Sequence, residues 1–175
     1  MFDIHTTFKT FCQKLKPVWV VIIVTFILLI IELFFYFLFL FLRIPHESNL
    51  PIILPTSHIE IVLFMGFLFI KACILAPIIE TFIFQYLIYE ILRVKFKFNT
   101  KIFIFISAIL FGLSHLTNYT TVVVTLVICV VFNYFYVVLI EIKPKKKAYL
   151  IIAIIHSSLN ACVFIDQFAQ LYFNK

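Results

Sequence analysis

Long apolar stretches separated by short polar ones dominate the hydrophobic pattern of this chain. The apolar stretches are residues 18–42, 61–92, 102–116, 122–140 and 148–173. A helix needs roughly 20 apolar residues to cross the hydrocarbon core of a bilayer, within a range of about 17–25. The first and fourth stretches have this length, and the last is slightly longer. The pattern therefore predicts an all-α, polytopic bundle of about five transmembrane helices, in one membrane domain over residues 1–175.

The second and third stretches depart from the ideal length in opposite directions. Residues 61–92 are too long for one straight crossing, and Pro77 interrupts them. Because proline removes a helical hydrogen bond, we predict one long helix kinked at Pro77, or else two segments that meet at Ala76–Pro77. Residues 102–116 are short, and we expect this span to borrow residues from 117–121.

Composition supports a membrane protein and argues against a soluble one. Apolar residues make up 65% of the chain and charged residues only 13%, whereas soluble domains average about 25% charged. The net charge of +6 comes from short lysine clusters at the ends of the apolar stretches, where anionic lipid headgroups attract them. No basic stripe lies on a soluble face, so we expect the lipid bilayer, and no nucleic acid, as a partner.

The basic clusters also predict the orientation of the chain. They fall before the first stretch, between the second and third, and between the fourth and fifth, whereas the segments at residues 43–60 and 116–121 carry few charges or none. With five crossings, all basic segments lie on one side, which the positive-inside rule assigns to the cytoplasm. We therefore predict a multi-pass protein of the cell membrane with a cytoplasmic N-terminus and an external C-terminus.

Polar side chains inside the apolar stretches are costly in lipid and are therefore candidates for function. They include Glu32, Lys71, Glu80, Gln85, His115, Asn133, His156 and Asn160. At 1.5 Å per residue from the cytoplasmic ends, Glu80, His115, His156 and Asn160 lie at depths of roughly 12–20 Å. These four side chains can therefore meet near the middle of the membrane. Phe111 and His115 share a helical face, as do His156 and Asn160, because each pair is four residues apart.

One carboxylate, two imidazoles and one amide permit two kinds of hydrolytic chemistry. Glu80 and a histidine can activate a water as general base while the other histidine and Asn160 bind an oxyanion. Alternatively, the glutamate and histidines hold a divalent metal such as zinc that activates the water. The helical zinc motif HExxH is absent, so we favour hydrolysis without a metal or other cofactor and leave zinc open.

Structural roles compete with these assignments. Polar side chains in a helical bundle often form hydrogen bonds between helices, and we expect this role for Asn133. Glu32 and Lys71 lie at similar distances from the outer ends of their helices, so we expect an ion pair between them. The four cysteines, Cys12, Cys73, Cys129 and Cys162, form no CxxC pair and resemble buried hydrophobic residues more than a disulfide or zinc set.

Three short motifs in order resemble the CAAX prenyl endopeptidase and bacteriocin-processing (CPBP, or Abi) family of intramembrane proteases. Residues 76–85 (APIIETFIFQ) resemble the family pattern P-x-x-E-E-x-x-F-R. Residues 107–115 (SAILFGLSH) are similar to F-x-x-x-H, and residues 153–160 (AIIHSSLN) are similar to H-x-x-x-N. The resemblance covers about residues 61–164. It implies a membrane-embedded peptidase in which Glu80 and His115 activate water while His156 and Asn160 bind the oxyanion.

The first motif departs from the family pattern at two positions, where Thr81 replaces the second glutamate and Gln85 replaces the arginine. Losing an acid and a base together leaves no unpaired buried charge. We include Thr81, Gln85 and Phe111 as supporting residues and expect reduced activity. The predicted substrate is a peptide or membrane-anchored protein; the sequence does not predict an oligomeric state.

Two other functions remain as alternatives. Many bacterial members of the family accompany peptide bacteriocins, so a self-immunity protein that acts by binding, with or without proteolysis, is the second hypothesis. A small transporter subunit that uses Glu32 and Lys71 is the third, although no inverted repeat supports it.

Overall fold

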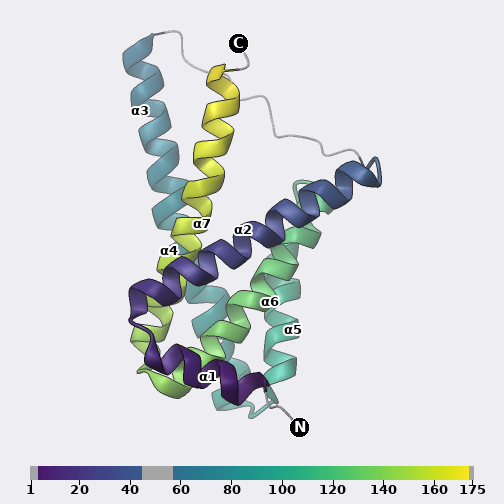
Figure 1. Ribbon diagram of the computed structural model, residues 1–175, viewed down its shortest axis with the longest axis vertical. Coiled ribbons are helices and arrows are strands. Elements are labelled where there is room, and N and C mark those ends of the chain that lie inside the picture. The colour runs from purple at the N-terminus through teal and green to yellow at the C-terminus, as the bar shows by residue number, and fades with distance from the viewer. Residues whose placement is uncertain (1–3, 45–56, 174–175) are drawn as a thin grey trace.

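The protein is a bundle of helices, as the hydrophobic pattern predicts (Figure 1). The computed structural model describes residues 4–44 and 57–173, and within these ranges it contains helices and no strands. Four helices are long and apolar enough to cross a membrane, and a fifth apolar helix is shorter. The chain is therefore a multi-pass membrane protein.

The helices follow one another with short connections. They are α1 (Ile4–Lys14), α2 (Pro17–Phe41), α3 (His58–Phe69), η1 (Ile70–Leu75), α4 (Ala76–Glu80), η2 (Thr81–Leu87), η3 (Glu90–Lys95), α5 (Thr100–Ser114), α6 (Tyr119–Ile142) and α7 (Lys145–Phe173). The η segments are π-helical, with hydrogen bonds between residues five apart. Helix α1 precedes the first apolar stretch and was not predicted from the hydrophobic pattern.

Residues 58–95, from α3 to η3, form one continuous helix, which we call the long helix. The chain passes through Pro77 without leaving the helical conformation, so the alternative of two separate segments is wrong. The hydrogen-bond register changes there instead, because π-helical η1 ends at Leu75 and α4 begins at Ala76. The long helix ends where Lys97 adopts a left-handed conformation with φ 57°, and the Phe98 N–H bonds the Leu92 carbonyl.

Helix α5 is shorter than a full crossing and does not gain residues from 117–121, contrary to our expectation. It ends at Ser114, and Asn118 begins the next helix by accepting a hydrogen bond from the Thr121 N–H over 2.8 Å. Residues 119–121 therefore belong to α6. As a consequence, the 15 residues of α5 rise only about 22 Å, which is less than the roughly 30 Å hydrocarbon core of a bilayer.

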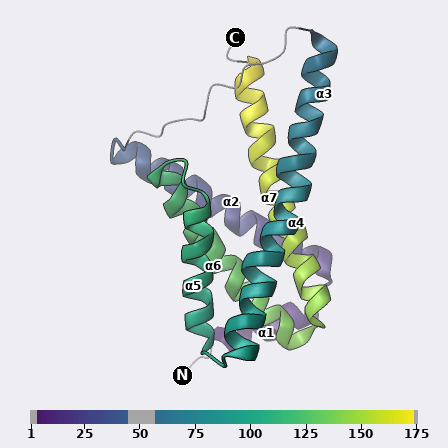
Figure 2. The same cartoon turned by 180° about the vertical axis from the view of Figure 1, so that it is seen from behind.

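All three basic segments lie at the same end of the bundle. Lys9 of α1 pairs with Glu141 at the end of α6 over 2.7 Å, and Lys145 of α7 pairs with Glu90 of the long helix over 2.6 Å. Figures 1 and 2 show α1 and the start of α7 at this end, and the last turns of α7 at the opposite end. The basic segments are therefore grouped on one side, as the positive-inside rule requires. Most of the predicted outer loop, residues 45–56, lies outside the described residues.

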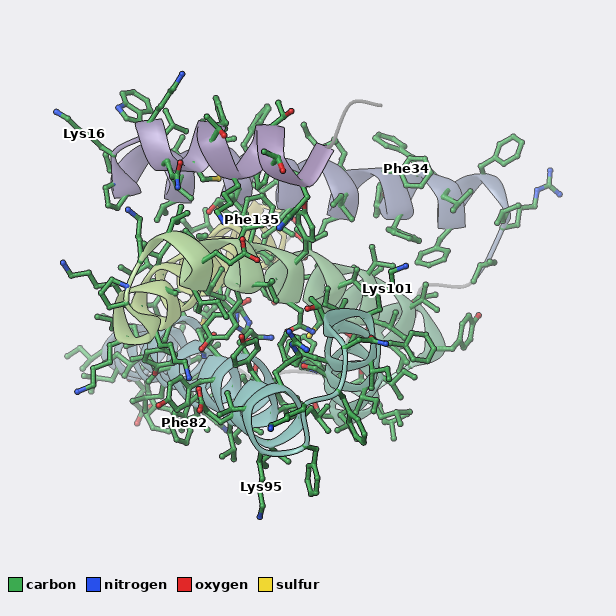
Figure 3. All side chains as sticks on the ribbon, turned by 90° about the horizontal axis from the view of Figure 1, so that it is seen from below. Lys16, Phe34, Phe82, Lys95, Lys101 and Phe135 are labelled. Carbon is green, nitrogen blue, oxygen red and sulfur yellow. The ribbon has the colours of Figure 1, made fainter. Side chains whose placement is uncertain are left out.

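The core is formed where α2 and α7 pack against α6. Leu28, Phe132 and Ile152 are fully buried in it. At the basic end, Phe135 of α6 meets Phe8 of α1 edge to face at 4.9 Å between ring centroids, and Figure 3 shows Phe135 between the N-terminal helices and α6 while Lys16 and Lys95 point outward. Apolar side chains therefore attach α1 to the bundle below the first span.

Helices α5 and α6 pack against each other, and a glycine permits their close approach. A Cβ atom on Gly112 would lie 3.1 Å from the Leu126 Cβ and 3.1 Å from the Val122 carbonyl oxygen. Such contacts are tighter than side chains normally make, and the backbone oxygen cannot rotate away. Gly66 on α3, by contrast, has no atom within 4 Å of a Cβ position.

We predict that Gly112→Ala lowers the free energy of unfolding by about 1–3 kcal/mol, because the added methyl group overpacks the α5–α6 contact. Thermal unfolding of the detergent-solubilised protein measures this change. Gly66→Ala is the matched control and should be neutral or slightly stabilising, since alanine favours the helix. Equal effects of both changes would show that the α5–α6 distance does not depend on Gly112.

The orientation can be tested with two cysteines introduced in the Cys162→Ser protein. Lys146 and Gln167 are both exposed and lie near opposite ends of α7. A thiol reagent that cannot cross membranes should label Gln167→Cys in intact cells, and Lys146→Cys only after the membrane is permeabilised, because basic segments stay in the cytoplasm. The reverse labelling pattern would contradict the predicted orientation.

Candidate active site

Glu80 and His156 meet in the middle of the bundle. Glu80 is the last residue of α4 and is half-buried, whereas His156 lies within α7 and is only 4% exposed. The Nε2 atom of His156 is 3.6 Å from Oε2 of Glu80. On the other side of the ring, the Thr81 hydroxyl lies 3.4 Å from Nδ1. Since an ionised carboxylate only accepts hydrogen bonds, this arrangement directs Nε2–H toward Glu80 and leaves Nδ1 to accept from Thr81.

Aromatic rings enclose the His156 imidazole. The Phe132 ring of α6 lies 5.0 Å away and the Phe111 ring of α5 lies 5.9 Å away, measured between centroids. Phe111 also contacts the His115 ring, at 4.5 Å. The predicted supporting residue Phe111 therefore lies between the two histidines and keeps both rings in place.

His115 is the residue at which α5 ends. Its Nδ1 lies 2.9 Å from the Phe111 carbonyl oxygen and 3.1 Å from the Ser114 hydroxyl oxygen. That hydroxyl donates its own proton to the same Phe111 carbonyl over 2.7 Å. Because a carbonyl only accepts, Nδ1 carries the proton and Nε2 keeps a free lone pair. His115 is also close enough to Glu80 and His156 to interact electrostatically with both. His115 therefore belongs to the same group of polar side chains as Glu80 and His156.

Asn160 lies one turn beyond His156 on α7 and faces the backbone of the long helix. Its Nδ2 donates a hydrogen bond of 2.9 Å to the Ala72 carbonyl. The structure thus brings Glu80, His115 and His156 together from three helices and places Asn160 next to them, in contact with η1.

Gln85, one turn below Thr81, belongs to a second polar cluster. Its Nε2 donates to Oδ1 of Asn133 over 3.2 Å and to Sγ of Cys129 over 3.4 Å. The Ser107 hydroxyl donates to the Phe84 carbonyl over 2.6 Å, and Asn133 also bonds the Ile104 carbonyl. We call Gln85, Ser107, Cys129 and Asn133 the Gln85 cluster. It joins the long helix to α5 and α6, as expected for Asn133 from the sequence.

Sequence reasoning missed Ser107 and Cys129 as members of this cluster. Cys129 and Asn133 are four residues apart, and Ser107 lies four residues before Phe111, so helical spacing was the available signal. Cys129 is fully buried as predicted, but it also takes part in the polar contacts. Nothing in the local pattern shows that Gln85 faces α6.

The structure does not form the predicted ion pair between Glu32 and Lys71. Both residues are described, yet no salt bridge joins them; Glu32 is half-buried on α2 and Lys71 is exposed on the long helix. Equal depth did not place them together because they lie on helix faces that do not meet. Nor do three or more His, Cys, Asp or Glu side chains come together as a metal site within the described residues.

We predict that Asn133→Leu lowers the free energy of unfolding by about 1–3 kcal/mol, because it leaves the buried amide of Gln85 without its acceptor. The double change Gln85→Leu with Asn133→Leu removes both partners and should restore much of this loss. Thermal unfolding in detergent measures both. If the double variant is less stable than either single variant, Gln85 and Asn133 do not act as a hydrogen-bonded pair.

Comparison with known proteins gives one family match, which includes the residues of this site. The family model described as type II CAAX prenyl endopeptidase Rce1-like matches residues 60–162, which contain Glu80, His115, His156 and Asn160. Neither the curated proteins nor the solved structures contain a significant match. Because the family model covers more than half of the chain, the protein belongs to the Rce1-like family of type II CAAX prenyl endopeptidases.

Proposed function

We propose that the protein is an intramembrane endopeptidase that hydrolyses a peptide bond of a membrane-anchored protein or peptide with a water activated by Glu80 and His115. The observation that carries this proposal is the contact of Glu80 with His156 over 3.6 Å, with His115 in the same chamber. A carboxylate and two imidazoles from three helices are expensive to hold inside lipid unless they serve a function.

Glu80 and His115, the two groups proposed to activate the water, can both accept a proton. Glu80 offers a carboxylate, and the Phe111 carbonyl holds His115 with its Nε2 lone pair free. A water between them gives its proton to this pair as its oxygen attacks the peptide carbonyl. The same proton then passes to the amine nitrogen as the C–N bond breaks, so a carboxylic acid and an amine leave.

The negative charge that forms on the carbonyl oxygen needs N–H donors in a site without bulk water. His156 is suited to this role, because its buried ring directs Nε2–H into the space beside Glu80. Thr81 supports this tautomer, since its hydroxyl can donate to Nδ1. The residue at the position of the second family glutamate therefore still acts on the site, but as a neutral group.

This replacement has a consequence for rate. With Thr81 in place of a second carboxylate, Glu80 is the acid residue of the chamber, and less negative charge is available to hold and polarise the water. We therefore expect slower turnover than a chamber with two carboxylates would give. Ile78 and Ile79, beside Glu80, are apolar and exposed on the surface of the bundle, which suits a substrate that is itself anchored in the bilayer.

The proposal predicts loss of cleavage in Glu80→Gln and in His115→Ala. The purified protein in liposomes is assayed with a fluorogenic farnesylated peptide that ends in a CAAX sequence. Each change should lower kcat by roughly 10²–10⁴, the usual effect of losing a general base. Glu90→Gln is the matched control on the same helix, and it should keep activity because Glu90 pairs with Lys145 near the membrane surface.

The same assay with a chelator tests the role of a metal ion. Cleavage that continues in the chelator agrees with activation by Glu80 and His115 alone. Full activity of Glu80→Gln would contradict the mechanism. The alternative function, binding, makes a different prediction. The protein in liposomes would then cleave neither this peptide nor a peptide precursor encoded by a neighbouring gene, yet it would still protect cells from the mature peptide.

A further inference from the structure

Pro77 leaves a backbone carbonyl of the long helix without its helical partner. At the end of η1, the Ala76 N–H bonds the Lys71 carbonyl, five residues earlier. If this π-helical register continued, the N–H of residue 77 would be the next donor and the carbonyl of Ala72 would be the next acceptor. Proline has no N–H, so this bond cannot form. Ala72 lies within the apolar span of the long helix, where water is scarce and a missing donor has to be replaced by the protein.

Asn160 supplies the donor that Pro77 lacks. Its Nδ2 bonds the Ala72 carbonyl over 2.9 Å. A second side chain of α7, Tyr149, donates its hydroxyl to the Ile78 carbonyl over 3.1 Å. The two bonds attach α7 to the long helix before and after Pro77, and His156, between Asn160 and Tyr149 in the sequence, contacts Glu80. The short α4 that presents Glu80 is thus held by α7 on both sides.

We propose that Asn160 is a positioning residue, whose amide replaces the missing N–H of Pro77 and holds the π-helical register of η1 that directs Glu80 toward His156 and His115. This inference rests on the proposed hydrolase function for its catalytic consequence, but the hydrogen bond itself does not. It differs from the role implied by the family resemblance, in which Asn160 binds the oxyanion.

The physical reason is the rotation that accompanies a change of register. A π-helical turn contains more residues than an α-helical turn, so a return to α-helical bonding before Pro77 would turn the following residues about the helix axis. Glu80 is only eight positions after Ala72, with no loop between them to absorb that rotation. Losing the Asn160 bond therefore moves the carboxylate relative to both histidines.

A double-variant experiment separates positioning from oxyanion binding. Asn160→Leu keeps the size of the side chain and removes the donor, and Pro77→Ala restores a backbone N–H able to bond the Ala72 carbonyl. We expect Asn160→Leu to lower kcat by about 10²-fold with little change in KM, since a displacement of about 1 Å has such an effect. Adding Pro77→Ala should raise kcat again by about tenfold, as expected for two groups that serve one carbonyl.

Controls keep the result interpretable. Pro144→Ala, a proline change just before α7, should not restore activity to Asn160→Leu. Asn160→Ala repeats the test if the leucine variant does not fold. All variants are assayed below their unfolding temperatures, and Tm is measured in detergent for the same set. The Tm lost in Asn160→Leu should return in part in the double variant with Pro77→Ala, whether or not any variant cleaves a peptide.

The outcomes are distinct. Restoration of both Tm and kcat by Pro77→Ala supports positioning. Restoration of neither overturns the inference and leaves oxyanion binding as the role of Asn160. The inference is also overturned if Asn160→Leu leaves kcat unchanged while Pro77→Ala restores its Tm. The hydrogen bond would then stabilise the fold without positioning Glu80. If no variant, nor the parent protein, cleaves the peptide, the proposed function fails, and the Tm comparison alone still tests whether Asn160 replaces the proline N–H.

Discussion

The absence of water in the bilayer is the constraint from which the rest of this structure follows. Each backbone carbonyl and N–H within the membrane must find a partner in the protein, and Pro77 removes one donor from the long helix. Side chains of neighbouring helices bond carbonyls of this helix: Asn160 bonds Ala72, Tyr149 bonds Ile78 and Ser107 bonds Phe84. The bonds that make the irregular helix possible are therefore also the bonds that hold α5 and α7 against it, and Glu80 lies between them.

A second consequence concerns the place where a helix stops. Helix α5 ends at Ser114 after only 15 residues, short of a full crossing, and its last carbonyls need donors there. The Ser114 hydroxyl and Nδ1 of His115 both lie within hydrogen-bond distance of the Phe111 carbonyl, and this contact favours the tautomer that carries its proton on Nδ1. Local capping thus favours one tautomer of a histidine that lies close to Glu80. The same hydrogen bond ends the helix and defines the chemistry available at its end.

The two departures from the family motif turn out to have different surroundings. Thr81 lies against the imidazole of His156, so its replacement of an acid bears on the residues of the proposed mechanism. Gln85 lies in the Gln85 cluster with Asn133 and Cys129, away from Glu80, so its replacement of a base concerns the packing of the long helix against α6. A neutral amide can be buried there with neutral partners, whereas an arginine would need a buried counter-charge.

The sequence by itself determined the approximate limits of the spans, the grouping of the basic segments and the polar residues expected at a common depth. It could do so because hydrophobic length, charge and helical rise are properties of each segment alone. Only the tertiary structure decided that Glu80 faces His156, that Glu32 and Lys71 stay apart and that Asn160 bonds Ala72. These depend on the rotation of each helix about its axis, which packing between helices sets. The end of α5 at Ser114 also depended on a partner for its last carbonyls, and no apolar run records where such a partner lies.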